Sequence, residues 1–212
     1  MQGVNENHVC CGSDEWRAFM RHEVIPWAFG DGDHVGDGPP FDGGGLGDDV
    51  LEVGPGYGAT TDVIHEHVAR LTSVEIDLEL ACVLRERFAG SNVDVLEGDA
   101  TAMPFVDGRF SGAVCFTMLH HVPTSELQDR LFAEVARVLA PGAPFVLGDS
   151  RASERLEEFH EGDTYNPVDP DALAPRLCRA GFDGVTVRSN DRGWVARGRR
   201  GPATRWPRTG HR

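Results

Sequence analysis

The segment that organises this chain is Val50-Leu51-Glu52-Val53-Gly54-Pro55-Gly56-Tyr57-Gly58-Ala59-Thr60-Thr61. An apolar run ends in an acid, passes into three glycines at alternate positions and enters a helix-like pattern. This order predicts a buried strand, a tight turn and a helix start, with backbone that a ligand can approach closely. The spacing Gly54-x-Gly56-x-x-Ala59 also fits the dinucleotide fingerprint, and Glu75 lies near the distance expected of its ribose-binding acid. The turn by itself therefore leaves open whether the ligand is a dinucleotide.

The rest of the chain alternates short apolar runs with helical patterns. The apolar runs predict strands at 50–53, 71–76, 93–96, 112–118 and 144–147, and a final hairpin of 185–188 with 194–197. Helical spacing predicts helices at 61–69, 80–88, 125–139 and 175–180, the third opened by the capping box Ser125-x-x-Gln128. Strands separated by helices of this length pair in parallel through right-handed crossovers. The expected fold is α/β, a doubly wound, mostly parallel, Rossmann-like sheet of seven strands with an antiparallel C-terminal hairpin.

Three parts are expected along the chain. Residues 1–47 combine a helical pattern, ended by Pro26-Trp27, with a linker rich in Gly, Asp and Pro. Residues 48–197 form the main domain, in which the polar segment 150–170 is expected to be irregular. Residues 198–212 form a basic tail, which we expect to be solvated and disordered; the alternative is a weak contact with RNA or an acidic surface.

The composition limits the class of protein. The 212 residues, 40% of them hydrophobic, suit one globular domain with a sizeable core. The formal charge is −14, and an acidic body disfavours a polyanionic partner such as nucleic acid. No window approaches the ~18 apolar residues of a membrane helix, and the N-terminus is too polar for a secretory signal. These features predict a cytoplasmic protein without a membrane partner. Cys82, Cys115 and Cys178 are expected to be small buried hydrophobes.

Carboxylates stand near the ends of the first three predicted strands, at Glu52, Glu75 and Asp99. Ligands of open α/β sheets bind beyond the carboxyl ends of the strands, so these acids are expected to share a crevice. A pyrophosphate at the glycine turn would be an awkward neighbour for Glu52. S-adenosylmethionine offers an ammonium, a ribose diol, an adenine amine and a sulfonium cation, and it has no phosphate. The charge pattern therefore favours S-adenosylmethionine over a dinucleotide.

Six motifs follow one another within residues 48–197. They are Val50-Leu-Glu-Val-Gly-Pro-Gly-Tyr-Gly58, Val74-Glu-Ile-Asp77, Gly98-Asp-Ala100, Met103-Pro-Phe…Asp107-Gly-Arg-Phe110, Thr117-Met-Leu-His-His121 and Leu139-Ala-Pro-Gly-Ala-Pro-Phe-Val146. In this order they resemble the class I S-adenosylmethionine-dependent methyltransferases of the small-molecule type, related to the ubiquinone and menaquinone biosynthesis methyltransferases. Ala143 stands where that family usually has a second glycine. The resemblance implies methyl transfer to a small-molecule acceptor, with S-adenosylhomocysteine as product.

The resemblance also implies roles for the glycine turn and the residue that precedes it. Gly54, Pro55, Gly56 and Gly58 would let the backbone approach the methionine part of the cofactor. Glu52 would support the turn or face the cofactor's amino group, and a purely structural role is the alternative.

The remaining cofactor contacts implied by the resemblance come from the next strands. Glu75 would accept hydrogen bonds from both ribose hydroxyls, and Ile76 would pack on the adenine, with a structural role as the alternative for Ile76. Asp99 would accept from the adenine amine, and Ala100 would supply a backbone contact.

The acceptor is expected beside the fourth strand. By the resemblance, Phe116 and Thr117 would border the methionine carboxylate and the transferable methyl. His121 follows them and is the predicted general base, with packing or capping at a helix entry as the alternative. His120 and Asp149 are further candidates for proton transfer.

Substrate contacts are predicted from two other segments. They are His160, Asp163 and Tyr165 in the segment after the fifth strand, and Phe19, His22 and Trp27 in the N-terminal segment. The N-terminal segment would close over the cofactor as a lid or pack on the sheet edge. No diagnostic ligand spacing occurs among these histidines and acids, so no metal site is predicted.

Other functions stay open at the level of sequence. One is an NAD(P)-dependent oxidoreductase that uses the same turn, and another is a cofactor-binding protein without transfer activity. A third is methylation of protein or RNA with help from the basic tail.

Overall fold

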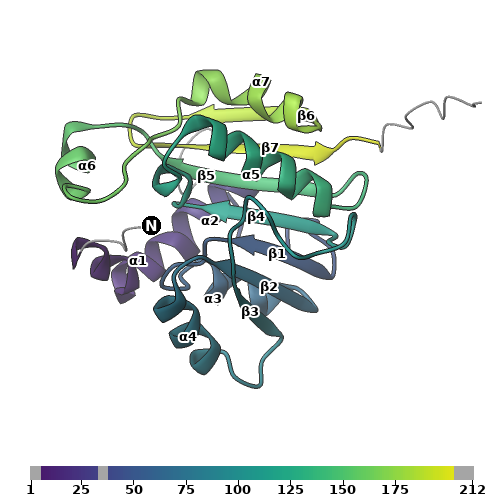
Figure 1. Cartoon of the computed structure of the whole chain (residues 1–212), viewed down its shortest axis with the longest axis horizontal. Helices are drawn as coiled ribbons and strands as arrows, with labels where there is room; N and C mark the ends of the chain where they lie inside the picture. The colour runs from purple at the N-terminus through teal and green to yellow at the C-terminus, as the bar shows by residue number, and fades with distance from the viewer. Residues whose placement is uncertain (1–5, 33–37, 203–212) are drawn as a thin grey trace, which may run out of the picture.

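The computed structural model describes residues 6–32 and 38–202. Its centre is a seven-stranded sheet in the order β3-β2-β1-β4-β5-β7-β6 (Figure 1). The strands are β1 (Asp49–Val53), β2 (Arg70–Glu75), β3 (Val93–Glu97), β4 (Gly112–Phe116), β5 (Pro144–Ser150), β6 (Phe182–Ser189) and β7 (Gly193–Arg200). The first five pair in parallel, whereas β7 runs antiparallel to both β5 and β6. The predicted fold class, including its antiparallel hairpin, is confirmed.

Helices cover both faces of the sheet, because successive residues of a strand point to opposite sides. Val50 packs in a core with α2 (Ile25–Phe29) and α3 (Thr61–Ile64), whereas Leu51 packs in a core with α5 (Ser125–Val138) and α7 (Pro170–Ala180). Figure 1 shows α5 and α7 in front of the sheet. Helix α4 (Leu78–Arg87) lies along β2 and β3. The strands therefore end at an edge that both layers leave open to the loops.

The N-terminal segment continues through the proline that was expected to end it. It consists of the 3₁₀ helix η1 (Glu6–Gly12), α1 (Asp14–Phe19), the π-helical turn η2 (Met20–Val24) and α2. Pro26 lies directly after the π-helical turn, in the first turn of α2, where a proline is tolerated. The prediction of a helix end at Pro26-Trp27 is therefore wrong, and the helix ends at Gly30.

The start of α5 differs from the predicted capping box. Thr124 is the N-cap, and its Oγ1 accepts a hydrogen bond from the backbone N–H of Leu127. The side chain of Gln128 instead donates to the carbonyl oxygens of Leu119 and Asn166. Gln128 thus ties α5 to two loops near the carboxyl edge of the sheet.

Five further features differ from the sequence pattern. The predicted helix 61–69 is α3 followed by the 3₁₀ turn η3 (His65–His67). Another 3₁₀ turn, η4 (Leu119–His121), follows β4. The segment expected to be irregular contains α6 (Glu154–Phe159), which is capped by Ser153. Helix α7 begins at Pro170, five residues before the predicted start. Strand β7 runs to Arg200, into the predicted tail; residues 203–212 of that tail lie outside the described part of the chain.

The cysteine prediction holds only for the strand. Cys115 is buried in β4, whereas Cys82 and Cys178 are exposed because they lie on the solvent faces of α4 and α7. Among the described residues, none of the helices has the length and hydrophobicity needed to cross a bilayer.

Candidate active site

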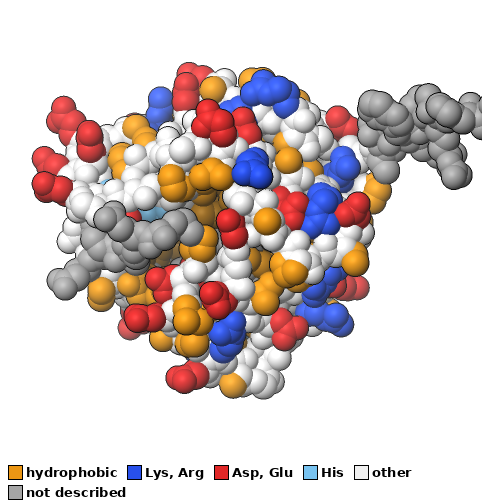
Figure 2. Space-filling view, in the orientation of Figure 1, with side chains coloured by type: hydrophobic (Ala, Val, Ile, Leu, Met, Phe, Trp, Pro, Cys, Tyr) orange, Lys and Arg blue, Asp and Glu red, His pale blue; other side chains and the backbone are white. Residues whose placement is uncertain are grey.

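A cavity of about 1520 Å³ opens at the carboxyl ends of β1, β2 and β4. Its wall also includes residues of η1 and of the segment 150–164. Pockets for one ligand usually enclose roughly 300–1,000 Å³, so this cavity has room for a cofactor together with an acceptor. Figure 2, drawn in the orientation of Figure 1, shows histidine atoms on the left of the molecule, next to a group of apolar side chains.

The glycine turn lines this cavity with bare backbone. Gly54 has φ 67° and Gly56 has φ 53°, values that an L side chain rarely adopts. A Cβ on Gly54 would collide with the side chain of Met118, whereas a Cβ on Gly56 would enter open space. Gly54, Pro55 and Gly56 line the cavity, so a ligand meets main-chain atoms there.

Glu75 presents a nearly buried carboxylate at the same place. Its side chain lines the cavity, although the residue is only 5% exposed. Oε2 accepts a hydrogen bond from the N–H of Gly56 at 2.9 Å, and Oε1 accepts from the N–H of Asp77 at 3.0 Å. Burial raises the pKa of Glu75 above its ordinary value, while these backbone hydrogen bonds act in the opposite direction. These hydrogen bonds fix the orientation of the Glu75 carboxylate, which can accept further hydrogen bonds from two neighbouring donor groups of a ligand.

Apolar and polar groups flank Glu75 on the cavity wall. Ile76 is 46% exposed and Leu78 is 54% exposed, so two aliphatic side chains face the cavity without apolar cover. Asp99 and Ala100 lie on the wall as well, and Asp99 Oδ1 accepts from the N–H of Thr101 at 2.8 Å. The arrangement offers a flat apolar contact and a second carboxylate beside Glu75.

Glu52 and Gly58 do not line the cavity. Glu52 is 1% exposed, and its Oε2 accepts from the hydroxyls of Thr61 at 2.8 Å and Ser73 at 2.6 Å. Burial raises its pKa to about 7. A Cβ on Gly58 would come within 2.7 Å of Leu84 in α4. The geometry favours a structural role for Glu52, the alternative to a contact with the cofactor.

The end of β4 carries a strained backbone. Thr117 has φ 51°, and it is the one non-glycine residue with positive φ in the described chain. A β-branched residue is a true outlier in this region, and such strain costs about 1–3 kcal/mol. Its N–H donates to the carbonyl of Gly148 at 2.8 Å, which holds the conformation. Thr117 and the buried Phe116 both line the cavity.

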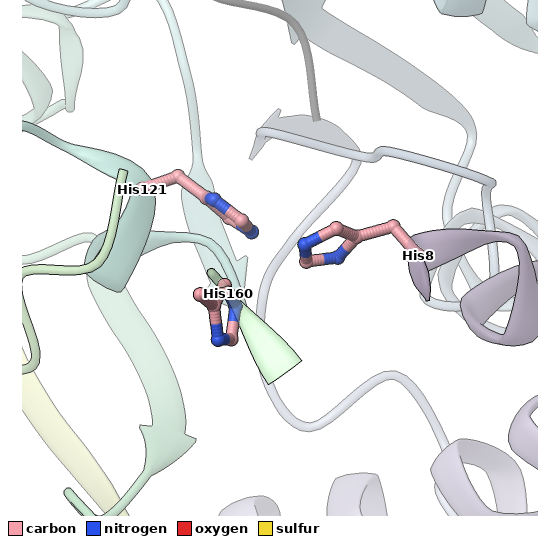
Figure 3. Close-up of side chains that lie close together, drawn as sticks. All are labelled: His8, His121 and His160. Atoms are coloured by element: carbon pink, nitrogen blue, oxygen red, sulfur yellow. The ribbon is translucent and has the colours of Figure 1, made fainter. Parts of the chain in front are cut away.

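A cluster of imidazoles follows β4. The ring of His120 lies 4.2 Å from that of His121 and 4.8 Å from that of His160, measured between centroids. His8, from the N-terminal segment, lies 4.8 Å from His121 and 4.9 Å from His160 (Figure 3). All four rings line the cavity.

Asp149 orients one member of the cluster. Its Oδ1 lies 2.7 Å from Nδ1 of His120, and its Oδ2 accepts from the backbone N–H of His120 at 3.1 Å. Burial lowers the pKa of His120, but the Asp149 carboxylate outweighs burial and raises it overall. For His121, burial and the neighbouring His120 lower the pKa to about 3. The cluster therefore contains a carboxylate-supported imidazole beside one that stays neutral.

The predicted substrate residues divide into two groups. His160 and Asp163 line the cavity, and Tyr165 stacks on His160 with a centroid distance of 4.6 Å. Phe19, His22 and Trp27 do not line it. Trp27 is buried in the core beneath the sheet, His22 is exposed elsewhere, and Phe19 packs near Trp16. The apolar stripe of this segment packs against the sheet, so the lid prediction is corrected for these residues.

An earlier part of the N-terminal segment reaches the cavity instead. His8, Cys10, Cys11 and Trp16 contribute to the wall. In the sequence, His8 is a single histidine in a polar stretch, and no periodic pattern distinguishes it. Only the three-dimensional proximity to His121 and His160 reveals it as a site residue.

Comparisons with known proteins identify a methyltransferase domain in this chain. Residues 50–142 match the family model described as "Methyltransferase domain". Ribosomal RNA small subunit methyltransferase A of Leptothrix cholodnii is 32% identical over 145 residues, which cover 61% of this chain and 53% of that protein. The chain thus spans about half the length of this relative.

Two solved structures share the fold of most of this chain. Phosphoethanolamine N-methyltransferase 2 of Haemonchus contortus, solved with phosphomonomethylethanolamine and S-adenosylhomocysteine, has a TM-score of 0.61 at 14% identity, over 74% of this chain and 49% of that chain. The complex between the Haloferax volcanii Trm112 methyltransferase activator and a methyltransferase contains a chain with a TM-score of 0.67 at 14% identity, over 94% of this chain and 98% of that chain. At these identities the likeness is one of fold.

Proposed function

We propose that this chain, whose residues 50–142 match a methyltransferase domain, is a class I S-adenosylmethionine-dependent methyltransferase that transfers a methyl group to a small-molecule acceptor. The observation that carries the proposal is a single cavity whose wall combines two groups of side chains. Glu75 and Ile76 adjoin the glycine turn, and the imidazoles of His120 and His121 follow β4. One group suits a nucleoside, and the other suits a polar acceptor.

The residues at the glycine turn fit the cofactor. Glu75 would accept hydrogen bonds from the ribose hydroxyls, Ile76 would lie against the adenine, and Asp99 would accept from the adenine amine. Gly56 leaves space for the methionine part, because no Cβ enters the cavity there. A dinucleotide fits less well, since the parallel dinucleotide-binding sheet has the order 3-2-1-4-5-6 and lacks the inserted antiparallel β7.

The acceptor would lie beside the imidazole cluster. When bound, S-adenosylmethionine supplies an activated methyl, so the protein must hold the acceptor in line with it and exclude water. His8 and Trp16 close the cavity from the N-terminal side. A proton lost by the acceptor would pass to His120, whose pKa is raised, rather than to His121, the base predicted from the sequence, whose pKa is lowered to about 3. The hydrogen bond from Nδ1 of His120 to Asp149 leaves Nε2 as the acceptor of that proton.

RNA methylation is the alternative to methylation of a small molecule, because the relative from Leptothrix cholodnii is named as a ribosomal RNA methyltransferase. The formal charge of −14 favours a small molecule over a polyanion. Five cysteines without a disulfide support a reducing, cytoplasmic setting.

The test supplies tritium-labelled S-adenosylmethionine and a cell extract divided into RNA, protein and small-molecule fractions. We expect label in the small-molecule fraction, and Glu75→Ala should lower its incorporation. Label in the RNA or protein fraction would overturn the small-molecule proposal. Tight S-adenosylhomocysteine binding without label in any fraction would indicate a cofactor-binding protein without transfer activity.

A further inference from the structure

Three histidines from distant parts of the chain converge on one point. His8 comes from η1, His121 ends η4, and His160 follows α6. One ring nitrogen of each lies within 4.8 Å of the corresponding nitrogens of the other two. Figure 3 shows the three side chains directed toward a common centre. Spacing along the sequence gives no hint of this grouping.

The cluster leaves several buried polar atoms without hydrogen bonds. Nδ1 of His121 and Nε2 of His160 have no hydrogen-bond partner among the described residues, and Nε2 of His8 and Oδ2 of Asp163 have only their 3.1 Å contact with each other. His8 is 5% exposed and His160 is 4% exposed, so the protein surrounds most of each side chain. Unsatisfied buried atoms are costly, and native structures seldom leave them without a partner of some kind.

The tautomer of His160 is fixed by its neighbour. Nδ1 lies 2.6 Å from the carbonyl oxygen of Leu156, which can only accept, so Nδ1 carries the proton. Neutral His160 therefore directs the lone pair of Nε2 into the cluster. Metal-binding histidines typically donate their second nitrogen to a carbonyl or carboxylate in this way.

A carboxylate completes the set of donors. Oδ1 of Asp163 accepts from the N–H of Thr164 at 2.6 Å, which fixes the side chain. Oδ2 lies 3.1 Å from Nε2 of His8 and 3.8 Å from Nδ1 of His121. Three imidazole nitrogens and one carboxylate oxygen are ligands that zinc and similar ions accept in tetrahedral sites.

We propose that His8, His121 and His160 bind a divalent transition-metal ion of the zinc type, with Asp163 as a fourth ligand. Tetrahedral Zn–N bonds of about 2.0–2.1 Å place ligand atoms about 3.3 Å apart, so small ring rotations would close the site. The ion would join the N-terminal segment to the cavity wall. His120 and Asp149 stay outside the coordination set and keep their hydrogen bond to each other. The site goes beyond the proposed methyl transfer and does not depend on it.

The experiment titrates chelator-treated full-length protein with Zn²⁺ by calorimetry and with Co²⁺ by visible absorption. We expect one equivalent of metal per chain, and the d–d bands of tetrahedral Co²⁺ displaced by Zn²⁺. His8→Asn and His160→Asn should each weaken Zn²⁺ binding at least tenfold. His67→Gln, a change at an exposed histidine, should bind Zn²⁺ like the parent.

Separate measurements distinguish a loss of metal binding from a loss of folding. Far-UV circular dichroism of the metal-free variants should match the parent, and Zn²⁺ should raise the melting temperature of the parent but not of His8→Asn. Asp163→Asn should shift the Co²⁺ absorption bands if Asp163 is a ligand. Replacement of a carboxylate that does not bind the metal would leave the bands unchanged. Absence of one-equivalent binding, or equal affinity in the parent, His8→Asn and His160→Asn, would overturn the proposal. Cofactor is omitted throughout, so that result would leave the methyl-transfer proposal standing.

Discussion

Gly56 and Glu75 are joined by a 2.9 Å hydrogen bond from the glycine turn to the carboxylate at the end of β2. The second carboxylate oxygen accepts from the N–H of Asp77, so one side chain fixes both the turn and the start of α4. The carboxylate also lies on the cavity wall. Ligand binding at Glu75 is therefore coupled to the shape of the glycine turn.

Replacement of this carboxylate should weaken cofactor binding. Glu75→Ala removes a charged acceptor for the ribose hydroxyls, and we expect a loss of about 1–3 kcal/mol in S-adenosylhomocysteine binding, measured by calorimetry. Glu79→Ala removes an exposed acid from the same helix region and should bind with parental affinity. Equal affinity of Glu75→Ala and the parent would rule out the assigned role.

The strained backbone at the end of β4 predicts an unusual response to glycine. Thr117→Gly relieves the positive φ, and the free energy of unfolding should rise by about 1 kcal/mol in urea denaturation. Thr186→Gly, the same change at an exposed position in β6, should lower it by about 1 kcal/mol. A similar loss in both variants would show that Thr117 stores no strain.

Buried Glu52 should make stability depend on pH. Burial raises its pKa from 4.5 to about 7, so the folded chain retains a proton that the unfolded chain releases near pH 4.5. Stability therefore falls as pH rises from about 4.5 through about 7, and the fall is complete above that value. Each pKa unit is worth ~1.4 kcal/mol. The free energy of unfolding of Glu52→Gln, relative to that of the parent, should therefore be higher at pH 8 than at pH 5 by about 2–3 kcal/mol.

Urea denaturation at both pH values provides this measurement. Glu86→Gln, at an exposed site in α4, is the control and should follow the parent at every pH. Parallel profiles for Glu52→Gln and the parent would mean that Glu52 is ionised in the folded chain at pH 5.

The cysteines report on the N-terminal part of the cavity wall. Cys10, Cys82 and Cys178 are exposed, whereas burial raises the pKa of Cys11 to about 12 and that of Cys115 well above its ordinary value. Thiolate is the reactive form, so an aromatic disulfide reagent should modify three thiols quickly and two slowly. Because Cys10 lines the cavity, S-adenosylhomocysteine should slow one of the fast reactions. In Cys10→Ser, S-adenosylhomocysteine should no longer slow any of the fast thiol reactions. If it still slows one of them, the ligand binds away from Cys10.

Local patterns were sufficient to predict the sheet. The run from Val50 to Val53 and its successors alternate with helical periods, and that alternation leads to parallel pairing whatever the loops do. One helix start was harder to predict, because a polar side chain had competing partners. Gln128 donates to the carbonyl oxygens of Leu119 and Asn166, so it does not perform the capping role that Ser125-x-x-Gln128 suggested.

The two sides of the candidate site differed in predictability. Residues beside the glycine turn, such as Glu75 and Asp99, follow strands directly, so topology brings them together. The cluster of His8, His121 and His160 depends on how three distant segments fold over the edge of the sheet, and no local spacing encodes that. Trp27 was predicted as a substrate contact but is buried in the core. Its place in an amphipathic segment does not reveal which surface that segment covers.

Calorimetric titration of the chain with S-adenosylhomocysteine and, separately, with NADH tests donor binding most directly. We predict one S-adenosylhomocysteine per chain, an affinity that falls about 5- to 150-fold in Glu75→Ala, and no heat of binding from NADH. Saturable NADH binding without S-adenosylhomocysteine binding would contradict the assignment of the cavity to a methyl donor.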